Sequence, residues 1–212
     1  MKSIIKAVIF DLDGLLIDSE PIWNKADDLF LQGKYSQDLK EKIMGMGQRE
    51  VIELFKKETG LEGDTDELLE KRRKLLNSLL MNDLRLFAGA KNLLETLKLR
   101  KYAMAIATGG YSKTKTEEIL TKVGIRNYFS VVVSGDEVKR GKPFPDIFLD
   151  AAKKLGVSPK VCLVLEDALN GIEAAKAAEM MSYGVNSDEK IRKQLKEKGA
   201  YEVFSNLLEI KL

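Results

Sequence analysis

The chain has 212 residues, of which 44% are hydrophobic, and its 35 Lys and Arg residues against 33 Asp and Glu residues give a formal net charge of +2. Its charges are interspersed and no apolar run approaches the roughly 18 residues of a membrane span, so neither nucleic acid nor a membrane is expected as a partner. The chain contains no histidine, which excludes Ser-His-Asp and Cys-His catalysis and the usual zinc sites and leaves carboxylates, Lys, Thr, Ser or a hard metal ion.

Short β-branched or apolar runs recur along the chain. The first run, Ala7–Phe10, is followed by residues 15–84, where apolar side chains recur at helical spacing and no segment is typical of a strand. From Phe87 onward, strands alternate with helices, which is the pattern of a parallel sheet covered on both faces. The predicted strands are 7–10, 102–107, 130–133, 161–165 and 181–185, and the predicted helices after Phe87 are 91–98, 114–123, 145–155 and 171–178.

This order of elements predicts an α/β fold, a doubly wound parallel sheet with an inserted small α-helical domain. We assign residues 1–15 and 84–212 to the α/β core and residues 16–83 to the helical insert. The length supports this arrangement, because a chain of this size can bury one full core and carry an insert.

The single cysteine, Cys162, cannot form an internal disulfide, and its neighbours Val161, Leu163 and Val164 indicate a buried strand. The opening Met1 to Phe10 lacks the cleavage pattern of a signal peptide. We therefore expect a cytoplasmic monomer whose partner is a small molecule.

Acidic side chains follow two of the predicted strands. Asp11 and Asp13 come after the first strand, and Glu166 and Asp167 come after the fourth. Ligands of open parallel sheets bind beyond the carboxyl ends of the strands. One such Asp alone is usually a turn former or helix cap, but a cluster of carboxylates repels itself unless a cation or protons neutralise it. With only oxygen ligands on offer, the cation expected is magnesium.

Two local patterns fail as known binding loops. The segment from Gly135 to Pro143 has five residues between its glycines and a proline where a phosphate-binding loop needs Ser or Thr. Asp11, Asp13 and Gly14 imitate the start of a calcium loop, but the glycine comes too early and a strand precedes them.

Four segments, AVIFDLDGLLIDSEP, ATGG, GKPFPDIF and LVLEDALNGIEAAKAA, stand in this order between Ala7 and Ala178. Together they resemble the motifs of the haloacid dehalogenase superfamily. The resemblance implies a Rossmann-like core with a helical cap inserted after the first motif. Within the superfamily, DGLLIDSEPIW is most similar to the sugar- and polyol-phosphate phosphatases, with beta-phosphoglucomutase and pseudouridine-monophosphate phosphatase as relatives.

The resemblance implies roles for individual residues. Asp11 would be the nucleophile and Asp13 the general acid and base. Thr108, Gly109 and Lys142 would bind the transferring phosphoryl group. Thr108 could instead cap a helix and Lys142 could be an exposed side chain.

The resemblance also implies a magnesium cofactor, held by the Asp11 carboxylate, the Asp13 backbone carbonyl and Asp167. Glu166 would be a further ligand, directly or through water. Phosphoryl transfer to a carboxylate requires that the charges of both groups be neutralised, which magnesium can do. The resulting expectation is a magnesium-dependent phosphatase that acts on a small sugar, polyol or nucleoside phosphate through an aspartyl-phosphate intermediate.

The insert holds two candidate substrate residues. Arg49 could bind a sugar hydroxyl or a second phosphate, or be a solvated helix charge, and Trp23 could line the pocket or pack the hinge of the insert. Family members with mutase activity resemble one another in carrying a histidine in the segment where Trp23 falls, so we expect hydrolysis. Glu179 stands where many relatives have a glycine, which predicts an altered turn at a helix end.

Three alternatives stay open at this stage. A phosphoglucomutase shares every core motif and would differ only in the insert. A haloacid dehalogenase would use Asp11 to attack carbon, without magnesium and without Asp13. A catalytically silent binding domain would be expected to have lost these motifs.

Overall fold

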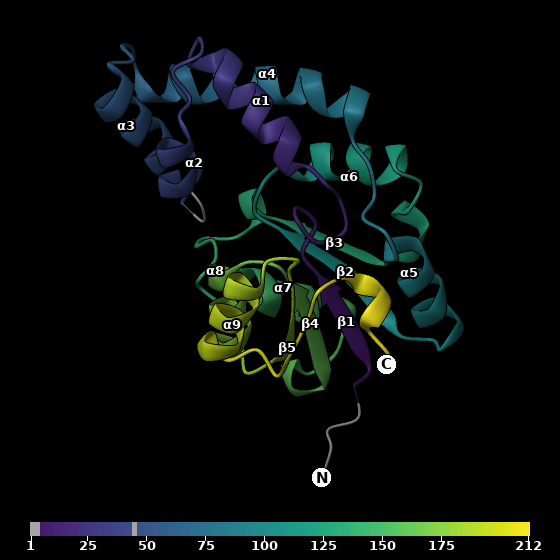
Figure 1. Cartoon of the computed structure of the whole chain (residues 1–212). Coiled ribbons are helices and arrows are strands. Elements are labelled where there is room, and N and C mark those ends of the chain that lie inside the picture. Colours follow the sequence, from purple (N-terminus) through teal and green to yellow (C-terminus); the bar gives the residue numbers. More distant parts are fainter. Residues whose placement is uncertain (1–4, 44–45) are drawn as a thin grey trace. The chain divides into compact units, whose positions relative to one another are not determined.

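The computed structural model describes residues 5–43 and 46–212. The chain forms two compact units, one made of Met1–Asp18 with Arg85–Leu212 and the other of Ser19–Leu84 (Figure 1). The smaller unit is thus inserted after the first strand of the larger one. No described helix combines the length and the hydropathy that a bilayer span requires.

The larger unit is built on one parallel sheet. In the described part of the chain its strands lie in the order β3-β2-β1-β4-β5-β6, and every neighbouring pair is parallel. The predicted α/β fold with a doubly wound sheet is confirmed, and the predicted strand boundaries hold to within one residue. The strands are β1 (Ala7–Phe10), β2 (Ala103–Thr108), β3 (Val131–Ser134), β4 (Cys162–Glu166), β5 (Met181–Val185) and β6 (Glu202–Phe204).

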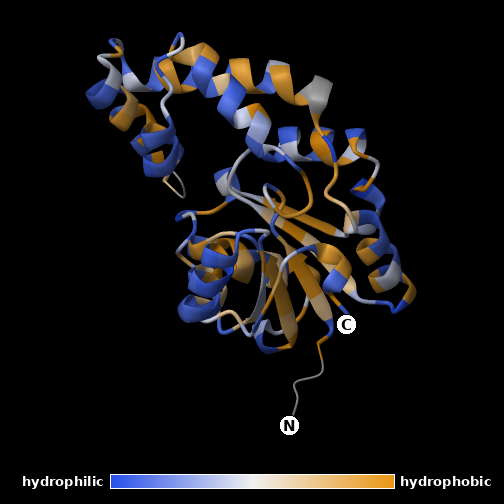
Figure 2. Cartoon of the chain, in the orientation of Figure 1, coloured by the Kyte–Doolittle hydropathy of each residue, from blue (hydrophilic) through white to orange (hydrophobic). Residues whose placement is uncertain are grey.

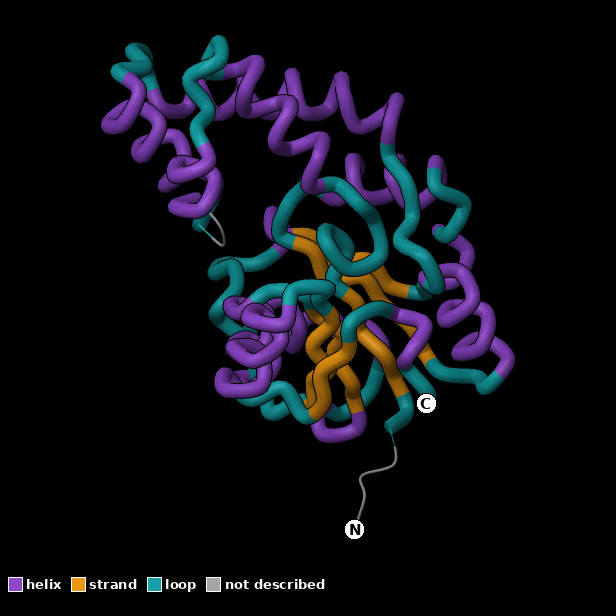
Figure 3. The backbone as a smooth tube through the Cα atoms, in the orientation of Figure 1, coloured by secondary structure: helices purple, strands orange, loops and turns teal. Residues whose placement is uncertain are grey.

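Helices cover both faces of this sheet (Figure 3). They are α5 (Ala90–Leu99), α6 (Lys113–Lys122), α7 (Asp146–Leu155), α8 (Leu169–Ala177) and α9 (Glu189–Lys198). The side chains of β1 show the two layers: Ile9 packs in a buried cluster with Phe148 of α7 and Ala174 of α8, whereas Phe10, which points to the opposite face, meets Phe129 edge-on at 5.8 Å between ring centres. Both faces are therefore buried, which explains the uninterrupted apolar run of β1.

One α-helix and one strand of the larger unit were not predicted. Helix α9 is mostly hydrophilic (Figure 2), and it buries only Leu195 fully. It is started by Asp188, whose carboxylate accepts the backbone N–H of Lys190 and Ile191 at 2.7 and 3.3 Å. Strand β6 has three residues, too few for an alternating pattern to show. Cys162, by contrast, lies fully buried in β4, as predicted.

The smaller unit consists of helices joined by loops throughout its described residues. The helices are α1 (Glu20–Phe30), α2 (Gln37–Ile43), α3 (Gln48–Thr59) and α4 (Thr65–Asp83). They enclose a core of their own, which contains Leu39, Ile52 and Phe55. A buried ion pair joins α4 to α1, because the guanidinium of Arg72 donates to both carboxylate oxygens of Asp27 at 2.6 and 2.9 Å.

The turn after α8 does not show the altered geometry predicted for Glu179, because the glutamate itself adopts a positive φ. This residue has φ +57°, in the left-handed region that L-residues other than glycine seldom adopt. Its N–H donates to the carbonyl of Lys176 at 3.0 Å, and the N–H of Met180 donates to that of Ala175 at 3.0 Å. The hydrogen bonds of the turn are therefore complete, and the glutamate adopts a backbone conformation that suits glycine.

Glu179→Gly should raise the free energy of unfolding by about 1 kcal/mol, because the left-handed conformation costs an L-residue more than the extra backbone freedom of glycine. Lys153→Gly, on an exposed position inside α7, is the matched control and should lower it by about 1 kcal/mol. Urea denaturation of both variants measures the difference. Equal destabilisation by both would show that the turn is not strained.

Candidate active site

The carboxyl ends of three neighbouring strands carry the candidate residues. Asp11 directly follows β1, and its N–H donates to the carbonyl oxygen of Leu165 in β4 at 3.0 Å. Thr108 is the last residue of β2, and Glu166 is the last residue of β4. Because β1 lies between β2 and β4, the sheet places Asp11 between the other two residues.

Lys142 joins Asp11 to Glu166. Its Nζ atom lies 2.5 Å from Oδ1 of Asp11 and 2.5 Å from Oε1 of Glu166, and only 9% of its side chain is exposed. Burial alone would lower the pKa of Lys142, but the two carboxylates raise it above its ordinary value. Lys142 is therefore a buried, charged ammonium, and the alternative of an exposed side chain is wrong.

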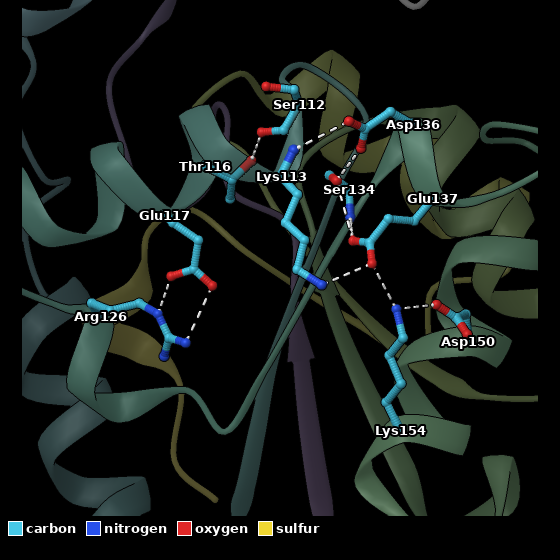
Figure 4. A network of polar contacts seen from close by, with 10 residues as sticks. All are labelled: Ser112, Lys113, Thr116, Glu117, Arg126, Ser134, Asp136, Glu137, Asp150 and Lys154. Atoms are coloured by element: carbon cyan, nitrogen blue, oxygen red, sulfur yellow. Dashed lines mark hydrogen bonds and ion pairs between the residues drawn. The ribbon is translucent and has the colours of Figure 1, made fainter.

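A polar network fixes the start of the loop that carries Lys142 (Figure 4). Glu137 is the last residue of the 3-10 turn Gly135–Glu137 (η2). Its carboxylate accepts hydrogen bonds from Nζ of Lys113 in α6 and from Nζ of Lys154 in α7, both at 2.9 Å. It also accepts the N–H of Ser134 at 3.0 Å. Partial burial alone would raise the pKa of Glu137, but these donors lower it to about 2. The ionised carboxylate thus ties two helices to this loop.

Both carboxylate oxygens of Glu166 have partners within the protein. Oε1 receives Lys142, and Oε2 accepts the N–H groups of Asp167 and Ala168, each at 3.0 Å, where α8 begins. Gly171 lets the carboxylate lie against α8, because a Cβ atom at this position would come within 1.8 Å of Oε1. Glu166 is therefore placed to hold the ammonium of Lys142 and the first turn of α8.

Asp167 lies against the turn that follows β1. A Cβ atom at Gly14, which has φ +74°, would come within 2.1 Å of Oδ2 of Asp167. The backbone carbonyl of Asp167 accepts Nδ2 of Asn186 at 3.3 Å. Burial first, and then the charges of Glu166 and Asp11, raise the pKa of Asp167 well above its ordinary value.

The pKa of Asp11 is also raised. Its side chain is buried, and this burial is the largest cause of its raised pKa. Lys142 lowers the pKa, whereas Glu166 and Asp13 raise it, and the resulting pKa of Asp11 is about 7. Lys142 pairs with Asp11 and Glu166, and Asp167 interacts electrostatically with all three, so the site holds more negative than positive charge. Protons or a cation must balance the excess.

The residues present fit a hard divalent cation. Asp11 and Asp167 offer carboxylate oxygens with raised pKa values, and Gly14 keeps space at Oδ2 of Asp167. Oxygen donors of this kind suit magnesium. No three acidic, His or Cys side chains converge as a metal cluster within residues 5–43 and 46–212. Two carboxylates would thus need the Asp13 carbonyl and water to complete a coordination shell.

Asp13 lies against the loop between β2 and α6. Its Oδ1 accepts the hydroxyl of Tyr111 at 2.5 Å, and its Oδ2 lies 3.4 Å from Oγ1 of Thr108. Thr108 is buried, and α6 is capped by Ser112, which accepts the N–H of Lys115 at 3.4 Å. Thr108 is therefore not a helix cap.

The remaining core prediction, Gly109, lies in the same loop and is exposed. Two residues of the site, Tyr111 and Asn186, were missed. Asn186 directly follows the carboxyl end of β5, so the rule that pointed to Asp11 could have found it. Tyr111 carries no comparable signal, because a tyrosine beside a helix start is typical of packing.

The two candidate substrate residues of the smaller unit already have partners there. Arg49, on the exposed side of α3, forms an ion pair with Asp66 of α4. The ring of Trp23 in α1 is covered by the guanidinium of Arg72, whose carbon lies 5.0 Å from the ring centre. A role of either residue in substrate binding stays a prediction.

Comparison with known families identifies the family of this chain. The model of a family described as haloacid dehalogenase-like hydrolase matches residues 8–185, which include every candidate residue from Asp11 to Asp167. The chain belongs to the haloacid dehalogenase-like hydrolases. The resemblance inferred from the four motifs is thereby confirmed.

Individual proteins are similar to this chain over most of their length. A phosphorylated carbohydrates phosphatase of Thermotoga maritima is 35% identical over 204 residues, 92% of each chain. Hexitol phosphatase B of Escherichia coli is 32% identical over 191 residues, 87% of this chain and 85% of that protein. The crystal structure of a beta-phosphoglucomutase from Clostridium difficile matches with a TM-score of 0.82 at 26% identity, covering 99% of this chain and 94% of that one.

Asp167→Asn should raise the free energy of unfolding of the metal-free protein by about 1 kcal/mol at neutral pH, because it removes a crowded charge. The pKa of Asp167 is higher in the folded than in the unfolded chain, so ionisation destabilises the folded protein. The gain should therefore shrink as the pH falls towards 3.8, the ordinary pKa of an aspartate. Urea denaturation in a chelator, at neutral pH and again at about pH 4, measures this.

Glu166→Gln is the matched control for Asp167→Asn. It makes the same chemical change one residue away, but Glu166 is fully paired, so the variant should lose about 2 kcal/mol. Loss of stability in both variants would show that Asp167 bears no unfavourable charge.

Proposed function

We propose that this protein is a magnesium-dependent phosphatase that hydrolyses a small phosphomonoester, such as a sugar, polyol or nucleoside phosphate, through an aspartyl-phosphate on Asp11. The observation that carries the proposal is the buried ammonium of Lys142 on Oδ1 of Asp11. It holds a carboxylate at a strand end beside Thr108 and Asp13. The names of the two similar phosphatases, one acting on phosphorylated carbohydrates and one on hexitol phosphates, support the substrate class.

The chemistry divides between the two aspartates at the end of β1. An oxygen of Asp11 attacks phosphorus, and the bond from phosphorus to the leaving oxygen breaks as Asp13 gives that oxygen a proton. Asp13 then takes a proton from a water molecule whose oxygen attacks the phosphorus of the aspartyl-phosphate. Inorganic phosphate leaves, and Asp11 is restored.

The remaining residues bind and neutralise the phosphoryl group. Lys142, the hydroxyl of Thr108 and the backbone N–H of Gly109 would contact its oxygens. Magnesium, when held by Asp11, the Asp13 carbonyl and Asp167, supplies the positive charge that lets a carboxylate approach a phosphate. Since both oxygens of Glu166 are engaged within the protein, we propose that it orients Lys142 and meets the metal only through water.

The purified protein should release inorganic phosphate from members of a panel of phosphorylated metabolites in the presence of magnesium and lose this activity in a chelator. Asp11→Asn should reduce turnover by at least about 10⁴-fold, because an amide of nearly the same volume cannot act as the nucleophile. Asp28→Asn, an exposed aspartate of α1, is the matched control and should keep full activity.

Substantial turnover in a folded Asp11→Asn variant would contradict the nucleophile assignment. Full phosphate release without any metal would contradict the magnesium requirement, whereas metal-independent halide release from a haloacid would favour the dehalogenase alternative, in which Asp11 attacks carbon.

A mutase is the second candidate, because the chain is similar to a beta-phosphoglucomutase over nearly its whole length. A mutase must keep water from the aspartyl-phosphate until the sugar rebinds. At the segment where mutases carry a histidine, this chain has Trp23, whose indole N–H donates one hydrogen bond and accepts none. Its ring is also engaged by Arg72. Both observations favour hydrolysis.

With beta-glucose 1-phosphate and catalytic glucose 1,6-bisphosphate, free phosphate should therefore form faster than glucose 6-phosphate. Both products are followed in the same reaction, so that one measurement compares the two fates of the aspartyl-phosphate. Glucose 6-phosphate forming much faster than phosphate would establish the mutase.

A further inference from the structure

The side chain of Tyr111 is placed unusually for a residue that only fills space. It is 7% exposed, and its hydroxyl donates to Oδ1 of Asp13 at 2.5 Å. This distance is typical of an O–H group bonded to a carboxylate. A phenylalanine ring could fill the same space, so the specific contribution of the tyrosine is the hydrogen bond from its hydroxyl to Asp13.

The other oxygen of Asp13 faces the same loop. Oδ2 lies 3.4 Å from Oγ1 of Thr108, and a Cβ atom at Gly110 would come within 2.7 Å of Oδ2. A residue with a side chain at position 110 would therefore displace the carboxyl group. Tyr111 from one side and Gly110 from the other together define where this group lies.

The backbone around Asp13 does not determine this position. Asp13 is bridged to Ile17, and the N–H of Gly14 donates to the carbonyl of Ile17 at 3.0 Å. These contacts hold the main chain of the turn after β1. The side chain can still rotate about its own bonds, and the contacts from the β2–α6 loop restrict this rotation.

We propose that Tyr111 is a positioning residue that holds the Asp13 carboxyl group through Oδ1, so that Oδ2 delivers the proton to the leaving oxygen. This inference rests on the proposed phosphatase function. Its consequence is selective: Tyr111 matters for substrates whose leaving oxygen needs a proton, such as sugars and polyols, and little for those whose leaving group departs as a stable anion.

Tyr111→Phe should lower kcat/KM for an alkyl phosphate such as glycerol 3-phosphate by about 10- to 100-fold. For 4-nitrophenyl phosphate, whose phenolate leaves without a proton, kcat/KM should change less than about twofold. This ratio is the appropriate readout because it reports the steps up to departure of the leaving group and not the later hydrolysis of the aspartyl-phosphate.

Tyr128→Phe is the matched control. The hydroxyl of Tyr128 also donates to a carboxylate, that of Glu95 at 3.3 Å, but this pair lies on the exposed surface. This variant should leave both substrates unchanged. A second, independent variant, Gly110→Ala, should repeat the substrate-selective loss, while Gly141→Ala, whose Cβ would meet no heavy atom within 4 Å, should not.

The outcomes separate the two proposals. The alkyl phosphate used is one that the wild-type protein hydrolyses in the panel above, and release of phosphate from no member of that panel would overturn the phosphatase function itself. An active wild type in which Tyr111→Phe and Gly110→Ala slow both substrates equally, or slow neither, would overturn the positioning role alone. Circular dichroism of each variant identifies any general loss of fold, and should one variant fail to fold, the other decides.

Discussion

The ammonium of Lys142 between Asp11 and Glu166 is the interaction on which the site depends. Without a cation, carboxylates at adjacent strand ends would repel one another, and burial would protonate them. The ammonium lies 2.5 Å from a carboxylate oxygen of Asp11 and of Glu166. Its positive charge therefore neutralises one negative charge of the cluster. Glu166 in turn takes its other two hydrogen bonds from the start of α8, so the ion pair also fixes where that helix begins.

Some of these groups are positioned by the strands of the sheet and others by loops. The register of β1 and β4 places Asp11 beside Glu166, because Phe10 pairs with Leu165 and each acidic residue directly follows one member of this pair. Lys142 comes from a loop, and a loop needs separate anchors. Glu137 provides them through two lysines of α6 and α7. The site thus combines a rigid edge with one cation that a surface network holds in place.

Much of the α/β core could be predicted from the sequence, because buried parallel strands are continuous apolar runs and their carboxyl ends share one edge. Helix α9 and strand β6 escaped notice because one is nearly all polar and the other is three residues long. The tyrosine on Asp13 could not be predicted either. Whether a side chain packs or donates a hydrogen bond depends on where its tip lies, and only the three-dimensional structure determines that.

The buried pair of Arg72 and Asp27 has a consequence for how this protein can change over evolution. The guanidinium meets both carboxylate oxygens of Asp27 and also covers Trp23 and Phe55, so the helical unit compensates its own buried charge with its own residues. Its fold is thus specified from within, by partners that all lie between Ser19 and Leu84. Mutations at its exposed positions leave this buried pair intact. A lineage can therefore vary the exposed positions of this unit while its buried ion pair, and with it the packing of its helices, is inherited unchanged.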